Sequence, residues 1–597
     1  MDAGAQDQVF EISAREARGQ ILGRLVSLSV RREIVLVLLA CVVGVLAGSG
    51  ATLMSITAHW LHALLFSTGP GGFLSATPDL TSTYMYFVPA VGGLLIGLYA
   101  LVVKRLRPTP VVDPIEANAL EGGKMSLLDS VILSSQTVLG NGFGASVGME
   151  AGYTQWGSGI ASAIGQKLNL RRSDLRVLVG CGAAGGIAAA FHAPLAGAFY
   201  AFELIIGVYA IPHVAPVMAA ALLGYLSAQM LGVVGTPIII PHVPDIVASD
   251  YLLYLLLGFV GAALAILVMR LMTLVEQGFS RSGLPAPLRP VAGGLAVGAL
   301  ALVSPQVLAS GESAIHIQVD SAITLSVALI LALKILAAAC SLGSGFRGGL
   351  FSAALFLGSM MGKLFAGVVL LAAPFVHIDP VVAAVVGMAA LAVGIVGGPA
   401  TMTFLVLEAT SNLAIAGLVL VAAIACSLTV RLCFGYSFST WRMHLRGESI
   451  RGAHDVGILR ELTVARLMQA DPPVFPAGGQ VADLRARFRD TSVRVVALVD
   501  ERGAYAGIVR LLTALSADPA TPASALAICA DCAVQPGMSV QDALRRFEGT
   551  QTPVLAVTDG TAQNRPVGML DEAGALLAYA QALERQRRTL FGEDPAT

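Results

Sequence analysis

The sequence predicts a polytopic, all-α membrane protein followed by a soluble α/β domain. Three observations support this fold class. The 597 residues are 56% hydrophobic and only 13% charged, with a mean hydropathy of +0.77, which is typical of membrane proteins. Apolar segments continue with few interruptions from about residue 34 to residue 436, where a polar composition takes over. The third observation is internal repetition on both sides of that change.

Composition also argues against several classes of function. The 37 basic and 38 acidic residues leave a formal net charge of −1, so charge indicates no nucleic-acid partner. The seven cysteines are scattered, mostly within apolar runs, and we expect no disulfide framework. Cys529 and Cys532 have C-x-x-C spacing without a second pair or nearby histidines, so we expect no metal there. No nucleophile–base pair is evident, which argues against an enzyme.

The N-terminal segment, residues 1–32, is polar and has no cleavable signal pattern. Three arginines, Arg24, Arg31 and Arg32, directly precede the first apolar span. The positive-inside rule therefore places the N-terminus in the cytoplasm.

The membrane domain is expected at 33–450. Segments such as 34–66 and 251–276 can cross a ~30 Å bilayer, which takes about twenty helical residues. Other apolar segments, such as 194–208 and 399–409, are short and interrupted by Gly or Pro. They predict broken, tilted helices that end inside the membrane.

An internal repeat divides this domain into halves at about 33–236 and 251–440. The segments "HAPLAGAFYAFE" and "GGPATMTFLVLE" both run from a proline to a glutamate at the same spacing. The matched pairs at one constant separation are Pro194 with Pro399, Glu203 with Glu408, Gly140 with Gly345, Gly144 with Gly349 and Gly157 with Gly362. Paired halves of broken helices are typical of transporters, whose site lies near the membrane midplane.

Residues 451–597 have the composition of a cytosolic α/β domain and are also repeated, at about 460–516 and 522–590. "PAGGQVADLRARF" resembles "PGMSVQDALRRF", and "VVALVDERGAYAGIV" resembles "VLAVTDGTAQNRPVGML". Each unit predicts a helix, a buried strand, a turn, a second strand and another helix. Such paired units usually pack together and can bind a ligand in the cleft between them.

Four segments of the membrane domain resemble motifs of the CLC family of chloride channels and chloride/proton exchangers. They are "GASVGMEAGYTQWGSGI", "GCGAAGGIAAAFHAPLAGAFYAFE", "GSGFRGGLF" and "GMAALAVGIVGGPATMTFLVLEAT", in that order. The C-terminal repeat resembles the paired CBS (cystathionine β-synthase) domains of many members. The resemblance implies two inverted-topology repeats, a homodimer with one pore per subunit, a bacterial inner-membrane location and a cytoplasmic C-terminus.

The resemblance also implies that Glu150 is the gate. When deprotonated, this glutamate occupies the anion position, and when protonated it swings aside. A helix beginning near Ala151 would direct its N–H groups at this place, and we expect Gly148, Met149 and Glu150 to lie beside the anion. The amides of Leu350 and Phe351 would come from the other half of the repeat. A carboxylate at bilayer depth costs about 2.5 to 3.5 kcal/mol, which favours a functional role for Glu150.

Several positions depart from the family pattern. Met149 stands where a basic residue is usual. Val111 replaces the serine and Ser439 the tyrosine whose hydroxyls reach the central anion in the family, so bicarbonate, nitrate or another small anion becomes an alternative to chloride. A register shift of two residues would put Asp113 at the pore instead of Val111. We favour Asp113 as a cytoplasm-facing helix cap, because Asp before a helix-opening Pro is a common cap.

The sequence leaves the mode of transport open. Glu203 matches a glutamate shared by channels and exchangers and is a second proton-linked candidate. Leu204 stands where exchangers often carry an inner glutamate. Passive voltage- or pH-gated conduction is therefore an alternative to proton-coupled exchange. A membrane sensor or cation transporter with CBS domains is an alternative from another class, but few acids lie in the membrane domain to bind cations.

The expected partners are a small inorganic anion, protons and membrane lipid, and we expect no cofactor. Adenine nucleotide at the CBS pair is a further possibility, because family members can bind it there. Arg510 and Leu511 do not fit the Thr and Asp of such a site, and Asp571 lacks the threonine before it. A role in stabilising the dimer or in gating is therefore the default expectation for this domain.

Overall fold

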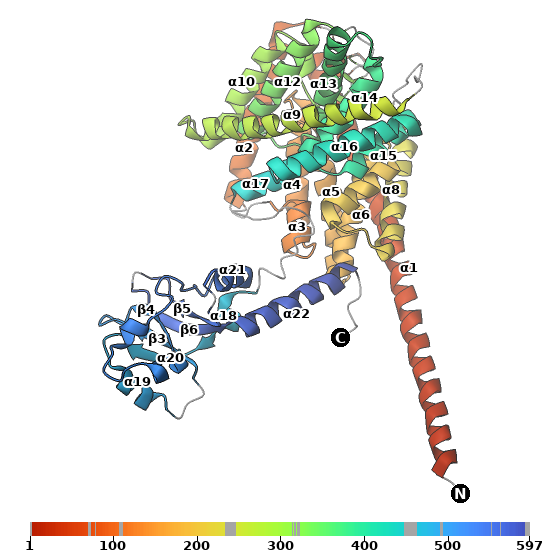
Figure 1. The fold of residues 1–597 in the computed structure, drawn as a ribbon. Coiled ribbons are helices and arrows are strands. Elements are labelled where there is room, and N and C mark those ends of the chain that lie inside the picture. The colour runs from red at the N-terminus through yellow and green to blue at the C-terminus, as the bar shows by residue number, and fades with distance from the viewer. Residues whose placement is uncertain are drawn as a thin grey trace. The chain divides into compact units, whose positions relative to one another are not determined.

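A computed structural model divides the chain into two compact units, Met1–Asp455 and Val456–Thr597 (Figure 1). The structure describes residues 3–69, 73–77, 79–106, 111–232, 246–312, 314–315, 318, 323–446, 462–489, 493–550, 552–561 and 563–591. In the helical stretches 3–31 and 585–591 it describes the backbone path alone. The boundary between the units lies close to the one predicted at residue 450.

The first unit is built from helices, as predicted. Its first half contains α1 (Ala3–Phe66), α2 (Val88–Leu106), α3 (Pro114–Leu120), α4 (Leu127–Gly142), α5 (Glu150–Lys167), α6 (Arg172–Phe191), α7 (Pro194–Tyr200) and α8 (Ile211–Met230). Its second half contains α9 (Ala248–Arg281), α10 (Arg289–Ala301), α12 (Leu325–Ser344), α13 (Phe351–Ala372), α14 (Pro380–Val396), α15 (Pro399–Thr410), α16 (Leu413–Cys433) and α17 (Phe438–Leu445). Shorter helical turns are η1 (Leu74–Ala76), η2 (Thr83–Phe87), the π-helical η3 (Ala201–Ile206), η4 (Ala286–Leu288) and η5 (Pro305–Val307).

Within the described residues, eight helical stretches are long and apolar enough to cross a membrane. The first of them begins at Arg32, where the polar N-terminal segment was predicted to end. The backbone has no break at that point, because α1 runs through it as one helix.

The two halves repeat the same packing. In the first half α5 packs on α6 and α1 on α8, and in the second half α13 packs on α14 and α9 on α16. Across the halves α2 packs on α10, and α7 packs on α15. The repeat that was predicted from glycine and proline spacing is therefore present in the fold.

Glycines allow the close helix contacts of each half. A Cβ on Gly157 of α5 would lie 2.1 Å from the carbonyl oxygen of Gly182 on α6. A Cβ on Gly362 of α13 would lie 1.9 Å from the carbonyl oxygen of Ala383 on α14. Larger side chains would push these helix pairs apart, as in other membrane helices packed through small residues.

Prolines set the starts of the short helices. Pro114, Pro194, Pro380 and Pro399 each occupy an early position of a helix, where the missing N–H leaves no internal bond unmade. The predicted helix breaks at 194–208 and 399–409 are confirmed by the starts of α7 and α15. Helix starts consequently lie inside the unit, with their N–H groups free to bind other partners.

The described residues of the second unit form two three-stranded sheets, in the orders β2-β3-β4 and β1-β6-β5. Its elements are α18 (Val464–Leu467), β1 (Gln469–Ala470), β2 (Val474–Pro476), α19 (Val481–Arg487), β3 (Val495–Val499), β4 (Tyr505–Arg510), α20 (Leu511–Ser516), η7 (Ala523–Leu526), α21 (Val540–Thr550), β5 (Val554–Thr558), β6 (Pro566–Asp571) and α22 (Glu572–Phe591). The antiparallel pairs β3–β4 and β5–β6 each follow a helix and each carry an irregularity near the end of the first strand. The predicted tandem of α/β units is thus confirmed.

Candidate functional site

The two halves of the membrane unit meet at a pair of glycines. Gly148 donates its N–H to the carbonyl oxygen of Gly349 at 2.9 Å, and Gly349 donates to that of Gly148 at 3.0 Å. Helix α5 begins two residues after the first glycine and α13 two residues after the second. The two helix N-termini therefore lie on either side of one short backbone bridge.

Glu150, the first residue of α5, reaches across this bridge. Its Oε1 accepts a hydrogen bond from the backbone N–H of Ser352 at 2.7 Å and another from the Ser352 hydroxyl. Its Oε2 has no hydrogen-bond partner among the described residues, and only 3% of the residue is exposed. A carboxylate from one half is thus bound by the helix N-terminus of the other half, which is favourable for a negative charge.

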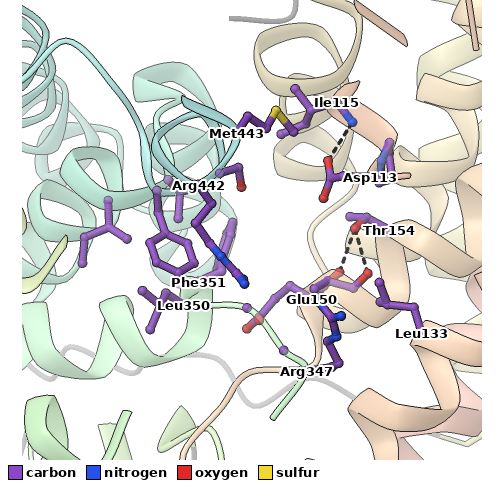
Figure 2. Close-up of a pocket in the computed structure, with 18 of the residues that line it drawn as sticks. Asp113, Ile115, Leu133, Glu150, Thr154, Arg347, Leu350, Phe351, Arg442 and Met443 are labelled. Atoms are coloured by element: carbon purple, nitrogen blue, oxygen red, sulfur yellow. Dashed lines mark hydrogen bonds between the residues drawn. The ribbon is translucent and has the colours of Figure 1, made fainter. Parts of the chain in front are cut away.

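Glu150 lies between two cavities. The first has a volume of about 670 Å³ and is named here the arginine cavity; its lining includes Glu150, Tyr200, Arg347, Phe351, Arg442 and Arg446 (Figure 2). The second has a volume of about 740 Å³ and is named here the histidine cavity; its lining includes His59, His62, Met149, His192, Glu312 and Ser352. The Glu150–Ser352 contact joins a residue that lines one cavity to a residue that lines the other.

Most residues that the sequence proposed for anion binding lie at this place. Val111, Leu350, Phe351 and Ser439 line the arginine cavity together with Glu150. Met149 lines the histidine cavity. Gly148 lies in close contact with the carboxylate of Glu150, since a Cβ added to this glycine would be 2.1 Å from Oε2.

Asp113 caps helix α3, as predicted. Its side chain accepts a hydrogen bond from the N–H of Ile115 at 2.9 Å, with Pro114 at the start of the helix (Figure 2). Asp113 also lines the arginine cavity, as Val111 does. The two residues were considered as alternatives for lining the pore, but both lie on the same cavity.

Glu203 has a different environment from Glu150. Its carboxylate accepts hydrogen bonds from the N–H groups of Ala400 at 3.0 Å and Thr401 at 2.9 Å, at the start of α15. The equivalent Glu408 accepts from the N–H groups of Leu195 at 2.8 Å and Ala196 at 2.9 Å, at the start of α7. Each half therefore caps a helix of the other, and Glu203 is not among the residues that line the two cavities.

Leu204, where an inner glutamate is often found in exchangers, packs against the main hydrophobic core. Its Cδ2 lies 3.3 Å from the place of a Cβ on Gly397, which precedes α15. A leucine in this environment offers no group that binds or releases a proton.

Several residues of the site were not predicted from the sequence. Ser352, rather than Leu350 or Phe351, supplies the amide that binds Glu150. Two residues with hydroxyl groups also line the arginine cavity, namely Thr154 and Tyr200, of which Tyr200 is 9% exposed. Arg347 and Arg442 also line it. Arg347 lies within the segment "GSGFRGGLF", and Arg442 lies three residues after Ser439, but nothing in one sequence indicates that the two arginines face the same space.

A buried carboxylate that is bound at a helix N-terminus between two cavities of a helical membrane unit is an arrangement suited to ion transport. The sequence profile of the family described as voltage gated chloride channel matches residues 101–431, and the chain belongs to this family. A ClcB-like chloride channel protein of Ralstonia nicotianae is 32% identical over 331 residues, which cover 54% of this chain and 77% of the relative.

Solved structures have the same fold. A slow cyanobacterial Cl⁻/H⁺ antiporter matches with a TM-score of 0.59 at 19% identity, over 69% of this chain and 97% of that one. A eukaryotic CLC transporter matches with a TM-score of 0.57 at 18% identity, over 90% of this chain and 97% of that one. The second match extends the likeness beyond the membrane unit, because that unit ends well before nine-tenths of the chain.

Proposed function

We propose that this protein transports a small monovalent anion across the membrane, with Glu150 as a titratable gate. Chloride is the default substrate, and bicarbonate or nitrate is the alternative. The proposed location is the bacterial inner membrane, with both termini in the cytoplasm and each subunit of a homodimer carrying its own path. The observation that carries the proposal is the bond of the Glu150 carboxylate to the Ser352 N–H between two cavities.

The physical reason is competition for one set of donors. A charge-assisted hydrogen bond from a helix N-terminus is available to a carboxylate or to a free anion, but not to both at once. Protonation removes the charge of Glu150 and with it most of the attraction to the Ser352 N–H. An anion then takes the vacated donors, so anion passage depends on the protonation of Glu150.

Passive conduction is the second candidate, and one observation favours it. Leu204 occupies the inner position in an apolar environment and cannot deliver protons to Glu150. Exchange would require another acid with access to the opposite side. Glu312, which lines the histidine cavity and interacts electrostatically with Glu150, lies on the same side as Ser352.

Flux from proteoliposomes tests both candidates. Purified protein is reconstituted with chloride, nitrate or bicarbonate inside, and anion efflux and pH are recorded together. We expect anion efflux that rises as the pH falls in the native protein, and efflux independent of pH in Glu150→Gln. Proton uptake against its own gradient, driven by the anion, identifies exchange, and anion efflux without it identifies conduction. Unchanged pH dependence in Glu150→Gln contradicts the gate.

The C-terminal unit is proposed to stabilise the dimer or to act on gating. Adenine-nucleotide binding in this unit is a separate hypothesis. Isothermal titration of the full-length protein with ATP tests it, and the absence of binding heat at millimolar nucleotide argues against a nucleotide site.

A further inference from the structure

Three guanidinium groups gather in the arginine cavity. Arg446, the residue directly after α17, forms an ion pair with Glu116 at 3.3 Å. Arg347 lies in the loop before α13, and Arg442 lies on α17. Within the described part of the chain, the guanidinium groups of Arg347 and Arg442 form no hydrogen bond and no ion pair. The guanidinium carbon of Arg442 lies 5.8 Å from the centre of the Phe438 ring.

The two unpaired guanidiniums face the space beside Glu150. Figure 2 shows the side chains of Arg347 and Arg442 extending from different segments toward that residue, and all three line the same cavity. The cavity also contains the carboxylates of Asp113, Glu150 and Glu276, and within the described residues none of them forms an ion pair with Arg347 or Arg442. Asp113 is engaged with the N–H of Ile115, and Glu150 with Ser352. Glu276 attracts Arg347, while Arg442 and Arg446 repel it.

The lining departs from the family pattern at the positions of its two hydroxyl donors, while Tyr200 and Thr154, which also carry hydroxyls, line the same cavity. Val111 has no hydroxyl, and Ser439 is shorter than the tyrosine of the family pattern. A guanidinium presents N–H donors in a planar fork, which binds two oxygens of one oxyanion at the same time. A halide is a single sphere and has no second oxygen to place against the other N–H of the fork. Two such forks in one cavity therefore favour a planar anion with two or three oxygens.

We propose that Arg347 and Arg442 form an oxyanion site in the arginine cavity, where they select a planar monovalent oxyanion of the nitrate or bicarbonate class over chloride. The inference rests on the proposed anion transport, for which it names the substrate class. In this site the planar arrangement of the guanidinium N–H groups selects an oxyanion over chloride, whereas the positive charge of the arginines attracts both kinds of anion. Lysine at either position keeps the charge and removes the fork, so Arg-to-Lys variants separate the two effects.

The test compares nitrate and chloride efflux from proteoliposomes containing the native protein, Arg347→Lys, Arg442→Lys or the control Arg446→Lys. We expect the native protein to prefer nitrate, and each of the first two variants to lose about tenfold in the nitrate-to-chloride ratio while chloride efflux continues. The control variant should keep the native ratio, because Arg446 is already paired with Glu116. Isothermal titration of the detergent-purified variants with sodium nitrate gives the same comparison for binding.

The outcomes separate this inference from the proposed function. Chloride and nitrate efflux with a ratio that neither lysine variant changes overturns the oxyanion site and leaves anion transport intact. A native preference for chloride overturns it as well. Absence of efflux of any anion from the native protein and from Glu150→Gln contradicts the proposed function itself. If a variant elutes as an aggregate in size-exclusion chromatography, its Arg-to-Gln counterpart is measured by nitrate titration, and native-like binding counts against the site.

Discussion

Replacing Gly148 by alanine should displace the Glu150 carboxylate without changing its charge. The added Cβ would lie 2.1 Å from Oε2, 2.6 Å from Oε1 and 2.7 Å from the carboxyl carbon, and these three atoms are its nearest neighbours. Distances below about 3 Å are not tolerated, so the carboxylate must move. The φ angle of Gly148 is not in the left-handed region, and alanine therefore adds no strain to the backbone.

The size of the effect follows from the hydrogen bonds that would be lost. Glu150 accepts two bonds from Ser352, and a bond to a charged group contributes roughly 1.5 to 3 kcal/mol. Loss of about 1.4 kcal/mol already lowers the occupancy of this position tenfold. We therefore expect at least tenfold faster anion efflux at neutral pH, together with a weaker dependence on pH.

Proteoliposome efflux at several pH values measures this effect. The matched control is Gly140→Ala, whose Cβ would lie 3.4 Å from its nearest neighbour, a carbon of Phe346, at ordinary contact distance. In Gly148→Ala/Glu150→Gln the two effects should not add, because both remove the same carboxylate from the same donors. Native rates and native pH dependence in Gly148→Ala would refute the proposed position of Glu150.

Three further predictions concern individual groups. Asp113→Ala should lower the stability of the first unit by about 1 kcal/mol through loss of the α3 cap, as measured by thermal unfolding in detergent, and native stability in this variant would contradict the cap. Glu408→Gln should lower the free energy of unfolding by roughly 1 to 3 kcal/mol, because one backbone N–H at the start of α7 loses its acceptor. Thermal unfolding in detergent measures this change, and the control variant Glu121→Gln, at an exposed residue, should have native stability. Burial and, to a smaller extent, a hydrogen bond with Cys529 raise the pKa of the Cys532 thiol to about 11, so the reactive thiolate forms only as the pH approaches that value. Iodoacetamide should label Cys532 slowly at pH 7.5 and faster at pH 10, and equal rates would contradict this.

The sequence predicted the elements that depend on local chemistry. Composition predicted the helical membrane domain, and prolines predicted the starts of α7 and α15. Asp before Pro predicted the α3 cap. Glu150 was identified because a carboxylate between glycines in an apolar chain needs a reason to be there.

Contacts between distant segments could not be predicted in the same way. Ser352 and Glu150 are about two hundred residues apart, and which amide of the "RGGLF" region meets the carboxylate depends on the exact position of α13. Arg347 and Arg442 reach one cavity from different segments. Glu203 fits a proton-linked role by alignment, but its bonds to Ala400 and Thr401 depend on how α7 packs on α15.

Anion binding measured by isothermal titration at pH 7.5 and pH 4.5 tests the central claim most directly. If the Glu150 carboxylate occupies the place of an anion, the native protein should bind anion weakly at pH 7.5 and at least tenfold more tightly at pH 4.5. Glu150→Gln should bind tightly at both pH values, because its donors from Ser352 are never taken by a charged carboxylate. Equal affinities of the native protein and Glu150→Gln at pH 7.5 would contradict the account.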